Sequence, residues 1–210
     1  MMPTATAALQ IADWRQQVFD LYAQVRDSAR SDSPSAAHAL WRAGRDRLFA
    51  THPASPLDAS AAASFNGLAV AGYQPDYRFE AVIDDDGVGE EMTVPTGTDG
   101  TVAFQRLGTV GLDGVGRLAL WRLASYGGGL FLPLRDGSAG QTGGTYGGGR
   151  YVLDTVKGSH LGVVGDRLVV DLNFAYNPSC AYDEAWACPL PGPDNRLDTE
   201  LRVGELYSTY

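Results

Sequence analysis

The segment EEMTVPTGTDGTVAFQRL, residues 90–107, decides the fold class. Apolar and polar side chains alternate on either side of its GTDG turn, and a period of two residues is that of a β-strand. The spacing predicts a hairpin in which Met92–Pro95 pairs with Thr101–Gln105. A second hairpin is expected at Gly165-Asp166, because glycine at the first central position suits a type II′ turn.

Similar strand patterns recur from about residue 77 to the end of the chain. Glycine-rich turns separate them, and the lack of an intervening helical pattern favours antiparallel pairing. We therefore expect a mainly β (α+β) fold, with an antiparallel barrel or sandwich of about nine strands. The predicted strands are YRFEAVI, EEMTVP, TVAFQRL, RLALWRL, LFLPL, RYVLDTV, HLGVV, RLVVDLNF and RLDTELRV.

Two helices are expected ahead of the strands, packed on the sheet. Apolar residues recur at three- and four-residue spacings from Trp14 to Val25. A second helix follows, with Ser33 as its N-cap and Pro34 at its first position. The chain is expected to form one domain over 1–210, with a helical segment over 1–52 and an antiparallel β core over 65–207. The polar residues Arg42, Arg45 and Asp46 are expected to form a solvated face of the second helix.

Composition and charge limit the classes of partner. The chain has 210 residues and a net charge of −9, and its few cations do not cluster, so neither nucleic acid nor a membrane is an expected partner. The N-terminus has no secretory signal pattern, which predicts a cytoplasmic protein with both cysteines as thiols. A small-molecule ligand is the expected partner, and a homo-oligomer is allowed but not indicated.

Three polar segments are expected to meet in one pocket at the end of the β core. They are the glycine-rich loop at Tyr146–Arg150, the strand end at Asp171–Asn177 and the loop at Cys180–Asn195. Period two places the side chains of the first and third residues of Asp171–Asn173 on one side of a strand. A glycine-rich loop can hold an anion with its backbone N–H groups, although the nucleotide-binding spacings are absent here.

The residue types in these segments favour acid–base chemistry on a small molecule, such as hydrolysis, elimination or isomerisation. Arg150 is expected to anchor an anionic or carbonyl oxygen, and Asp171 to act as the general base if burial raises its pKa. Tyr146 and Tyr176 are expected to donate hydrogen bonds or to act as the general acid. Ligand contacts are expected from Thr145, Asn173, Asn177, Cys180 and Asn195.

Each of these side chains also has a structural interpretation. Arg150 can form an internal ion pair with Asp136, Asp154 or Asp171, and asparagines can satisfy loop backbone groups. The two cysteines can be buried thiols, a nucleophile with its resolving partner, or metal ligands. Because no histidine has a metal-ligand spacing to either cysteine, no metal is predicted. No cofactor is predicted either. On this alternative the chain is a non-catalytic β-barrel binding or assembly module.

Four motifs give the chain a resemblance to a known family: LWRAGRDRLFATHPASPL, FNGLAVAGYQPDYRF, TYGGGRYVLD and DLNFAYNPSCAYDEAWACPLPGPDNRL. Together they resemble the domain of unknown function 1684 family, from about Trp14 to Glu205. The resemblance implies no activity, because none is established for that family. The segment GQTGGTY is about two residues longer than in the family pattern, and Gly192 replaces a usual proline. Positions inside the family motifs are Asp136, Thr145, Tyr146, Gly149, Arg150, Asn173, Tyr176, Asn177, Pro178, Cys180, Tyr182, Cys188, Pro189 and Asn195.

Overall fold

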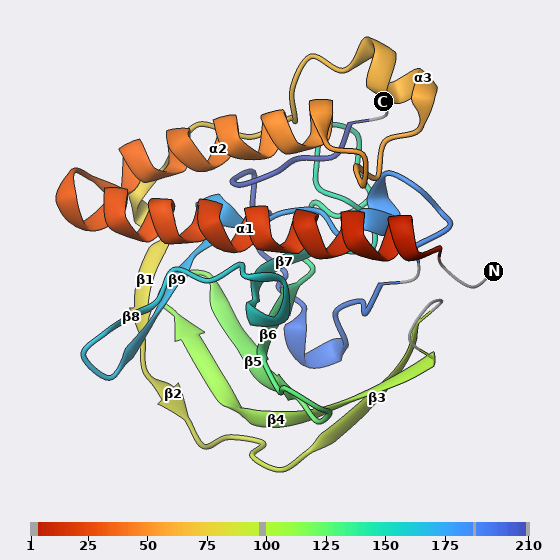
Figure 1. Cartoon of the computed structure of the whole chain (residues 1–210). Coiled ribbons are helices and arrows are strands. Elements are labelled where there is room, and N and C mark those ends of the chain that lie inside the picture. Colours follow the sequence, from red (N-terminus) through yellow and green to blue (C-terminus); the bar gives the residue numbers. More distant parts are fainter. Residues whose placement is uncertain (1–3, 97–99, 187, 209–210) are drawn as a thin grey trace.

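The structure, a computed structural model, describes residues 4–96, 100–186 and 188–208. Its two long helices, α1 (Ala5–Ser31) and α2 (Pro34–Thr51), confirm the helices expected from the apolar spacing, and a short α3 (Ala59–Ser64) was not predicted. Helices α1 and α2 lie side by side across one side of the strands (Figure 1). Ser33 caps α2 as expected, with its Oγ accepting from the N–H of Ala36 at 3.1 Å. Among the helices described, none has the length and apolar composition that a membrane crossing requires.

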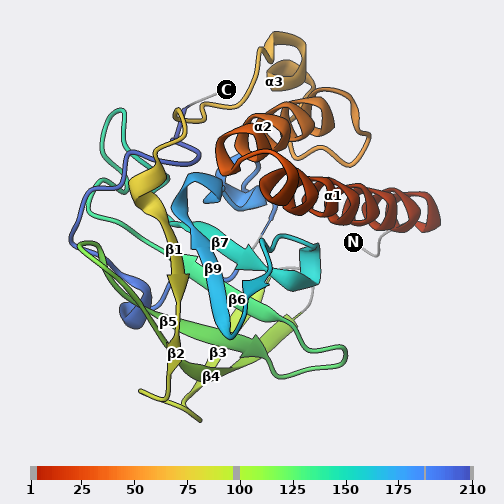
Figure 2. The same cartoon turned by 90° about the vertical axis from the view of Figure 1, so that its left-hand side faces the viewer.

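The nine strands of the described residues form two antiparallel sheets. The larger runs in the order β2-β4-β5-β6-β7 with β3 also on β4, and the smaller is β1-β9-β8. The sheets are arranged like a sandwich, so the fold is α+β, and over the described residues they do not close into a barrel (Figure 2). The strands are β1 (Arg78–Ala81), β2 (Ile83–Asp84), β3 (Glu91–Thr96), β4 (Gly100–Leu112), β5 (Gly116–Leu123), β6 (Leu130–Leu134), β7 (Arg150–Asp154), β8 (Val163–Val164) and β9 (Arg167–Asp171).

Both predicted hairpins are present as strand pairs. β3 pairs with β4 through Met92 opposite Phe104, although the turn residues 97–99 lie outside the described residues. β8 pairs with β9 through Val164 opposite Arg167. Between them Gly165 has φ +60°, and Asp166 is not left-handed, which is the pattern of a type II′ turn.

The apolar core lies in two clusters, and β5 shows how the sequence separates them. Leu118 and Leu120 point into the cluster between the two sheets, whereas Ala119 and Trp121 join the cluster beneath helices α1 and α2. Successive side chains of a strand face opposite sides, so a run without alternation fits a strand that is buried on both faces. Strand β5 thus lies between the two clusters and contributes side chains to both.

The strand predicted over residues 196–203 was wrong. Among the described residues this segment makes one isolated bridge, between Arg135 and Arg196, and belongs to neither sheet. Its burial nevertheless alternates, with Leu201 and Val203 buried and Arg202 exposed. The period-two pattern of this segment arises from the alternating burial of its side chains. Its backbone does not pair with a neighbouring strand, because its carbonyl groups accept hydrogen bonds from a side chain instead.

Candidate functional site

The side chain that binds the backbone carbonyl groups of the C-terminal segment is Arg150, at the start of β7. It is completely buried. Its guanidinium donates to the backbone carbonyl groups of Leu201 and Glu205, both at 3.1 Å, and to that of Val203. It also donates to Asp136 Oδ2 at 3.0 Å, forming an ion pair. Arg150 therefore ties down the C-terminal segment, and of the alternatives in the sequence the internal pair with Asp136 is the one that forms.

Asp136 is the centre of this cluster. Its carboxylate accepts from Thr145 Oγ1 at 2.7 Å and from both the N–H and the hydroxyl of Ser138, at 2.9 and 2.6 Å. Burial by itself raises the pKa of Asp136, but Arg150 and these donors outweigh it and hold the pKa below its usual value. Burial lowers the pKa of Arg150, yet from so high a starting value that the guanidinium stays charged. Thr145 and Arg150, predicted ligand contacts, are thus bound to protein groups.

Asp171 and Asn173 form a second cluster, at the end of β9. Asp171 Oδ1 accepts from the backbone N–H of Asn173 at 3.0 Å and from its side-chain amide at 2.8 Å. Tyr73 donates to the other carboxylate oxygen at 3.2 Å. The Asn173 side chain also exchanges hydrogen bonds with the backbone of Gln74, both at 2.8 Å. The backbone carbonyl of Asn173 is hydrogen-bonded to His38 Nε2 at 3.0 Å. This cluster ties the 73–74 segment and helix α2 to the smaller sheet.

The pKa of Asp171 is raised to about 6, as a general base would need, because the side chain is desolvated by burial. Neither Asp171 nor Arg150, however, lines the hollow beside Arg45 or the hollow beside Asn66. The condition set for Asp171 as a base, a raised pKa, is met, but Asp171 hydrogen-bonds Asn173 and Tyr73, whereas Arg150 pairs with Asp136.

Asp171→Asn is expected to stabilise the protein at neutral pH. The folded pKa of about 6 lies above the ordinary value of 3.8, so the folded state binds the proton more tightly than the unfolded state does. The wild-type protein therefore loses stability as pH rises from about 4 through about 6, by up to ~3 kcal/mol. Asparagine keeps the acceptor for Asn173 and cannot ionise, so the advantage of the variant should appear above about pH 6 and fade below about pH 4. Urea unfolding at both pH values tests this, and an equal difference at both would contradict it.

Asn195 forms a third cluster, within the larger sheet. Its side-chain oxygen accepts from Trp121 Nε1 at 2.8 Å, and its amide donates to the carbonyl groups of Ala119 at 2.8 Å and Pro133 at 2.9 Å. The side chain is 1% exposed. It fastens the proline-rich loop to strands β5 and β6, which leaves it little capacity for a ligand.

The glycine-rich loop and the cysteine loop do meet, as the sequence predicts. Tyr146 donates to the carbonyl of Cys180 at 3.1 Å, and its hydroxyl lies 3.8 Å from the Cys180 sulfur. The two loops are closely packed where they meet, because a Cβ added at Gly149 would lie only 2.6 Å from a side-chain atom of Pro191. Tyr146 and Cys180 therefore lie together where the two loops pack.

Tyr176 and Asn177 belong to a further cluster, built around a buried ion pair that the sequence did not reveal. Arg45 donates to Glu205 Oε2 at 2.7 Å, and Glu205 is fully buried. Asn177 donates to the same carboxylate through its backbone N–H at 3.2 Å and its amide at 3.3 Å. Burial raises the pKa of Glu205, although Arg45 and Asn177 oppose this shift.

The prediction that Arg45 lies on a solvated helix face was wrong, since its residue is only 9% exposed. Its guanidinium carbon lies 4.9 Å from the ring centre of Tyr176 and 5.2 Å from that of Phe49, within range of cation–π contacts. The spacing of Arg45 in the sequence could have indicated its burial. Arg45 lies four residues from both Trp41 and Phe49, in the middle of the apolar stripe of α2.

A small hollow opens beside this ion pair, between helices α1 and α2 and the segment 176–182. Its volume is about 60 Å³, which is room for about four water molecules or one polar group of similar size. Arg45 Nε and Asn177 Oδ1 are buried and have no hydrogen-bond partner among the described residues. Turning the Asn177 amide over would set its oxygen against the carboxylate of Glu205, so the orientation is fixed. The walls include Trp14, Val18, Tyr22, Leu48, Phe49, Tyr151, Tyr176 and Tyr182.

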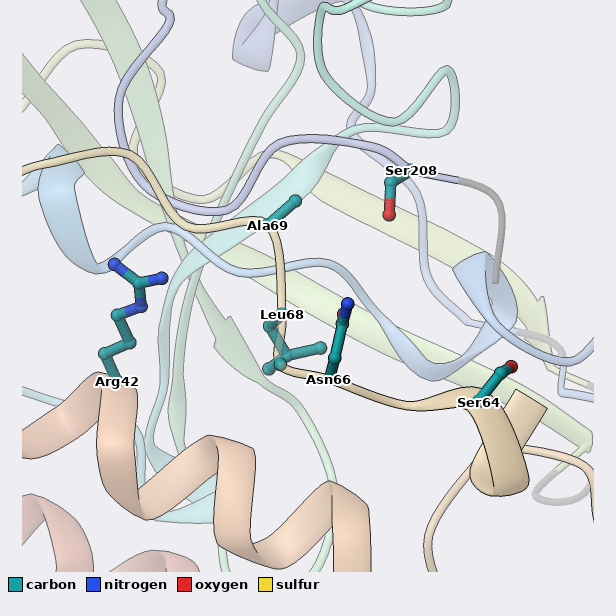
Figure 3. A pocket seen from close by; sticks show the side chains of 7 residues that line it. Arg42, Ser64, Asn66, Leu68, Ala69 and Ser208 are labelled. Atoms are coloured by element: carbon teal, nitrogen blue, oxygen red, sulfur yellow. The ribbon is translucent and has the colours of Figure 1, made fainter.

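A larger and more open hollow, of about 470 Å³, lies between α2 and the segment after α3 (Figure 3). Arg42, Ser64 and Asn66 on its rim are exposed, and its wall also includes Leu68 and Ser208. Size alone favours this hollow. The smaller hollow is the candidate site, because two of its lining residues, Arg45 and Asn177, carry buried polar atoms that lack partners among the described residues. No group of three or more potential metal ligands occurs among the residues described.

Comparison with known proteins places the chain in a family. A model of the family described as "Protein of unknown function (DUF1684)" matches residues 63–206. The solution NMR structure of an uncharacterized protein from gene locus rrnAC0354 of Haloarcula marismortui is 31% identical, with a TM-score of 0.58 over 85% of this chain and 96% of that one. No curated protein matches. The resemblance seen in the sequence is therefore confirmed, and the chain belongs to the DUF1684 family of proteins of unknown function.

Proposed function

We propose that this protein binds a small neutral molecule in the hollow beside the Arg45–Glu205 pair. The observation that carries the proposal is the pair of unpartnered buried atoms, a donor at Arg45 Nε and an acceptor at Asn177 Oδ1. Leaving such groups unsatisfied costs about 1–3 kcal/mol each, so a ligand that satisfies both gains that energy back.

The charges around the hollow favour a neutral polar group on the ligand. The Arg45 charge is already balanced by Glu205, and an added carboxylate would face both that buried carboxylate and the oxygen of Asn177. A carboxamide carries an acceptor and a donor side by side, as the two unpartnered atoms require. The aromatic walls suit an apolar body that extends toward the mouth of the hollow. We infer a ligand with a carboxamide-like head and an apolar body.

The small hollow is proposed to bind a ligand without catalysing an acid–base reaction. Burial raises the pKa of Tyr22 to about 12 and raises that of Tyr176 well above its usual value, so both hydroxyl groups stay protonated at neutral pH. Asp171, whose pKa suits a base, lies in another cluster. The groups that border the hollow can position a ligand by hydrogen bonds and aromatic contact.

Benzamide, benzoate and benzamidine form a matched set of probes for this site, because they share one ring and differ only in the head group. We expect benzamide at millimolar concentration to shift amide NMR signals around Arg45 and Asn177, and both ions to bind at least ~10-fold more weakly. Binding of all three alike, or shifts confined to the larger hollow, would contradict the proposal.

Val18→Phe supplies the matched variant, since Val18 lines the hollow from helix α1 and the larger ring would fill it. We expect this change to abolish benzamide binding while the protein stays folded. Val163→Phe is the control, because Val163 is 67% exposed on β8 and borders neither hollow. If no neutral probe binds to the wild-type protein, the assembly-module alternative becomes the better account.

A further inference from the structure

The larger hollow is enclosed by three parts of the chain: helix α2, the segment 64–69 and the C-terminal segment (Figure 3). Hydrogen bonds hold these parts in position. Asp46 Oδ1, on α2, accepts from the backbone N–H of Leu68 at 2.8 Å, and the carbonyl of Ala69 accepts from the N–H of Leu206 at 2.7 Å. The fold itself therefore forms the hollow, and its volume of about 470 Å³ lies within the range of about 300–1,000 Å³ that is usual for small-molecule sites.

Arg42 is the only charged side chain among the described lining residues of this hollow. Arg42 and Asp46 have the i, i+4 spacing of helical ion pairs, but Asp46 binds the N–H of Leu68 instead. Over residues 4–96, 100–186 and 188–208, the Arg42 guanidinium has neither an ion pair nor a hydrogen bond. Its planar fork of donors matches the two oxygen atoms of a carboxylate, so this end of the hollow suits an anionic group.

The other polar side chains of the hollow suit hydroxyl groups. Figure 3 shows Asn66 and Ser208 between Arg42 at one end and Ser64 at the other. Neither the Asn66 amide nor the Ser208 hydroxyl has a hydrogen-bond partner in the part of the chain that the structure describes. An amide and a hydroxyl can each donate and accept, as alcohol groups on a ligand require. The described lining residues include no aromatic ring, so the hollow offers no stacking surface for an aromatic ligand.

The surrounding charges favour a ligand with one negative charge over a ligand with two. Asp46 lies directly behind Gly67, another lining residue, because a Cβ added there would lie 3.4 Å from Asp46 Oδ2. A dianion would face this carboxylate with a single guanidinium to balance it, in a protein whose net charge is −9. A monocarboxylate needs only the charge that Arg42 supplies.

We propose that the larger hollow binds a small hydroxylated monocarboxylate of the sugar-acid class. Arg42 holds the carboxylate, and Asn66 and Ser208 hold hydroxyl groups. This site is separate from the hollow beside Arg45, because the two have no lining residue in common among those described. The two binding proposals can therefore succeed or fail independently.

Gluconate and sorbitol form a matched pair of probes, because both are six-carbon polyols and only gluconate carries a carboxylate. With the full chain at low salt, we expect gluconate at millimolar concentration to shift the amide NMR signals of Asn66, Leu68 and Ala69. Sorbitol should bind at least ~5-fold more weakly, since it forms no charge-assisted hydrogen bond with Arg42.

Arg42→Gln should lower the affinity for gluconate at least ~5-fold and bring it close to that for sorbitol. Arg47→Gln is the matched control, because Arg47 is also exposed on α2 but lines neither hollow. Arg42→Lys, which keeps the charge, should retain part of the preference for gluconate. Val18→Phe, which fills the small hollow, should leave gluconate binding unchanged.

Equal affinity of the wild-type protein for gluconate and sorbitol, or no shift at these three signals, would overturn the proposal. An Arg42→Gln variant that binds gluconate as tightly as Arg47→Gln does would overturn it too. Inorganic phosphate in its doubly charged form should bind more weakly than gluconate, and equal or tighter binding would contradict the choice of a monocarboxylate. Loss of gluconate binding in a folded Val18→Phe variant would place the probe in the small hollow and refute a separate site.

Discussion

Arg150→Met is expected to lower the free energy of unfolding by about 3–5 kcal/mol, which is the usual cost of removing one partner of a buried ion pair. The substitution leaves the Asp136 carboxylate without its counter-charge in the interior. It also removes the donor to three carbonyl groups of the C-terminal segment, which has no neighbouring strand to replace it. Urea unfolding followed by tryptophan fluorescence measures the loss.

Arg117→Met is the matched control for this experiment. Arg117 pairs with Asp84 at 2.7 Å, but both side chains are largely exposed, so little change in stability is expected. If Arg150→Met does not fold, Asp136→Asn provides a milder version, since asparagine retains part of the hydrogen bonding. Stability of Arg150→Met equal to that of the control would show that the cluster is not structural, and would return Arg150 to the candidates for ligand binding.

Glu205→Gln is expected to cost a similar ~3–5 kcal/mol, because glutamine keeps the shape of the side chain but leaves the Arg45 charge unbalanced in the interior. The double variant Arg45→Met/Glu205→Leu should recover most of the loss, since well-packed apolar side chains often replace a buried pair without penalty. Thermal and urea unfolding of the single and double variants give the comparison.

Glu80→Gln controls for the loss of a carboxylate, because Glu80 pairs with Arg78 on β1 with both side chains partly exposed. Its stability should stay close to that of the wild-type protein. A double variant no more stable than Glu205→Gln would contradict the account, because it would show that an unbalanced buried charge is not the cause of the loss.

The local features of the fold could be predicted from the sequence. The N-cap at Ser33 and the turn at Gly165 depend on a few neighbouring residues, and the structure confirms both. The period-two pattern also located eight of the nine predicted strands. It failed at 196–203, because alternating burial of Leu201 and Val203 looks the same whether the backbone pairs with a strand or with a guanidinium.

The candidate site was harder to predict, because it depends on contacts between distant parts of the chain. Arg45 meets a partner that lies 160 residues away, and a charged residue on a helix is normally exposed. The sequence singles out polar residues of the family motifs as candidates for catalysis or ligand binding, but the pattern does not show which face of a strand each one occupies. The sequence could therefore not show that Arg150, Asp171 and Asn195 bind separate parts of the protein.

A crystal structure with bound benzamide tests the central claim most directly. The account predicts electron density for the amide head in the hollow beside helix α1 and for the ring toward its mouth. The amide oxygen should lie within hydrogen-bond distance of Arg45 Nε, and the amide nitrogen within that distance of Asn177 Oδ1. Density in the larger hollow near Asn66 alone, or a benzamide bound against Arg150 or Asp171, would contradict it.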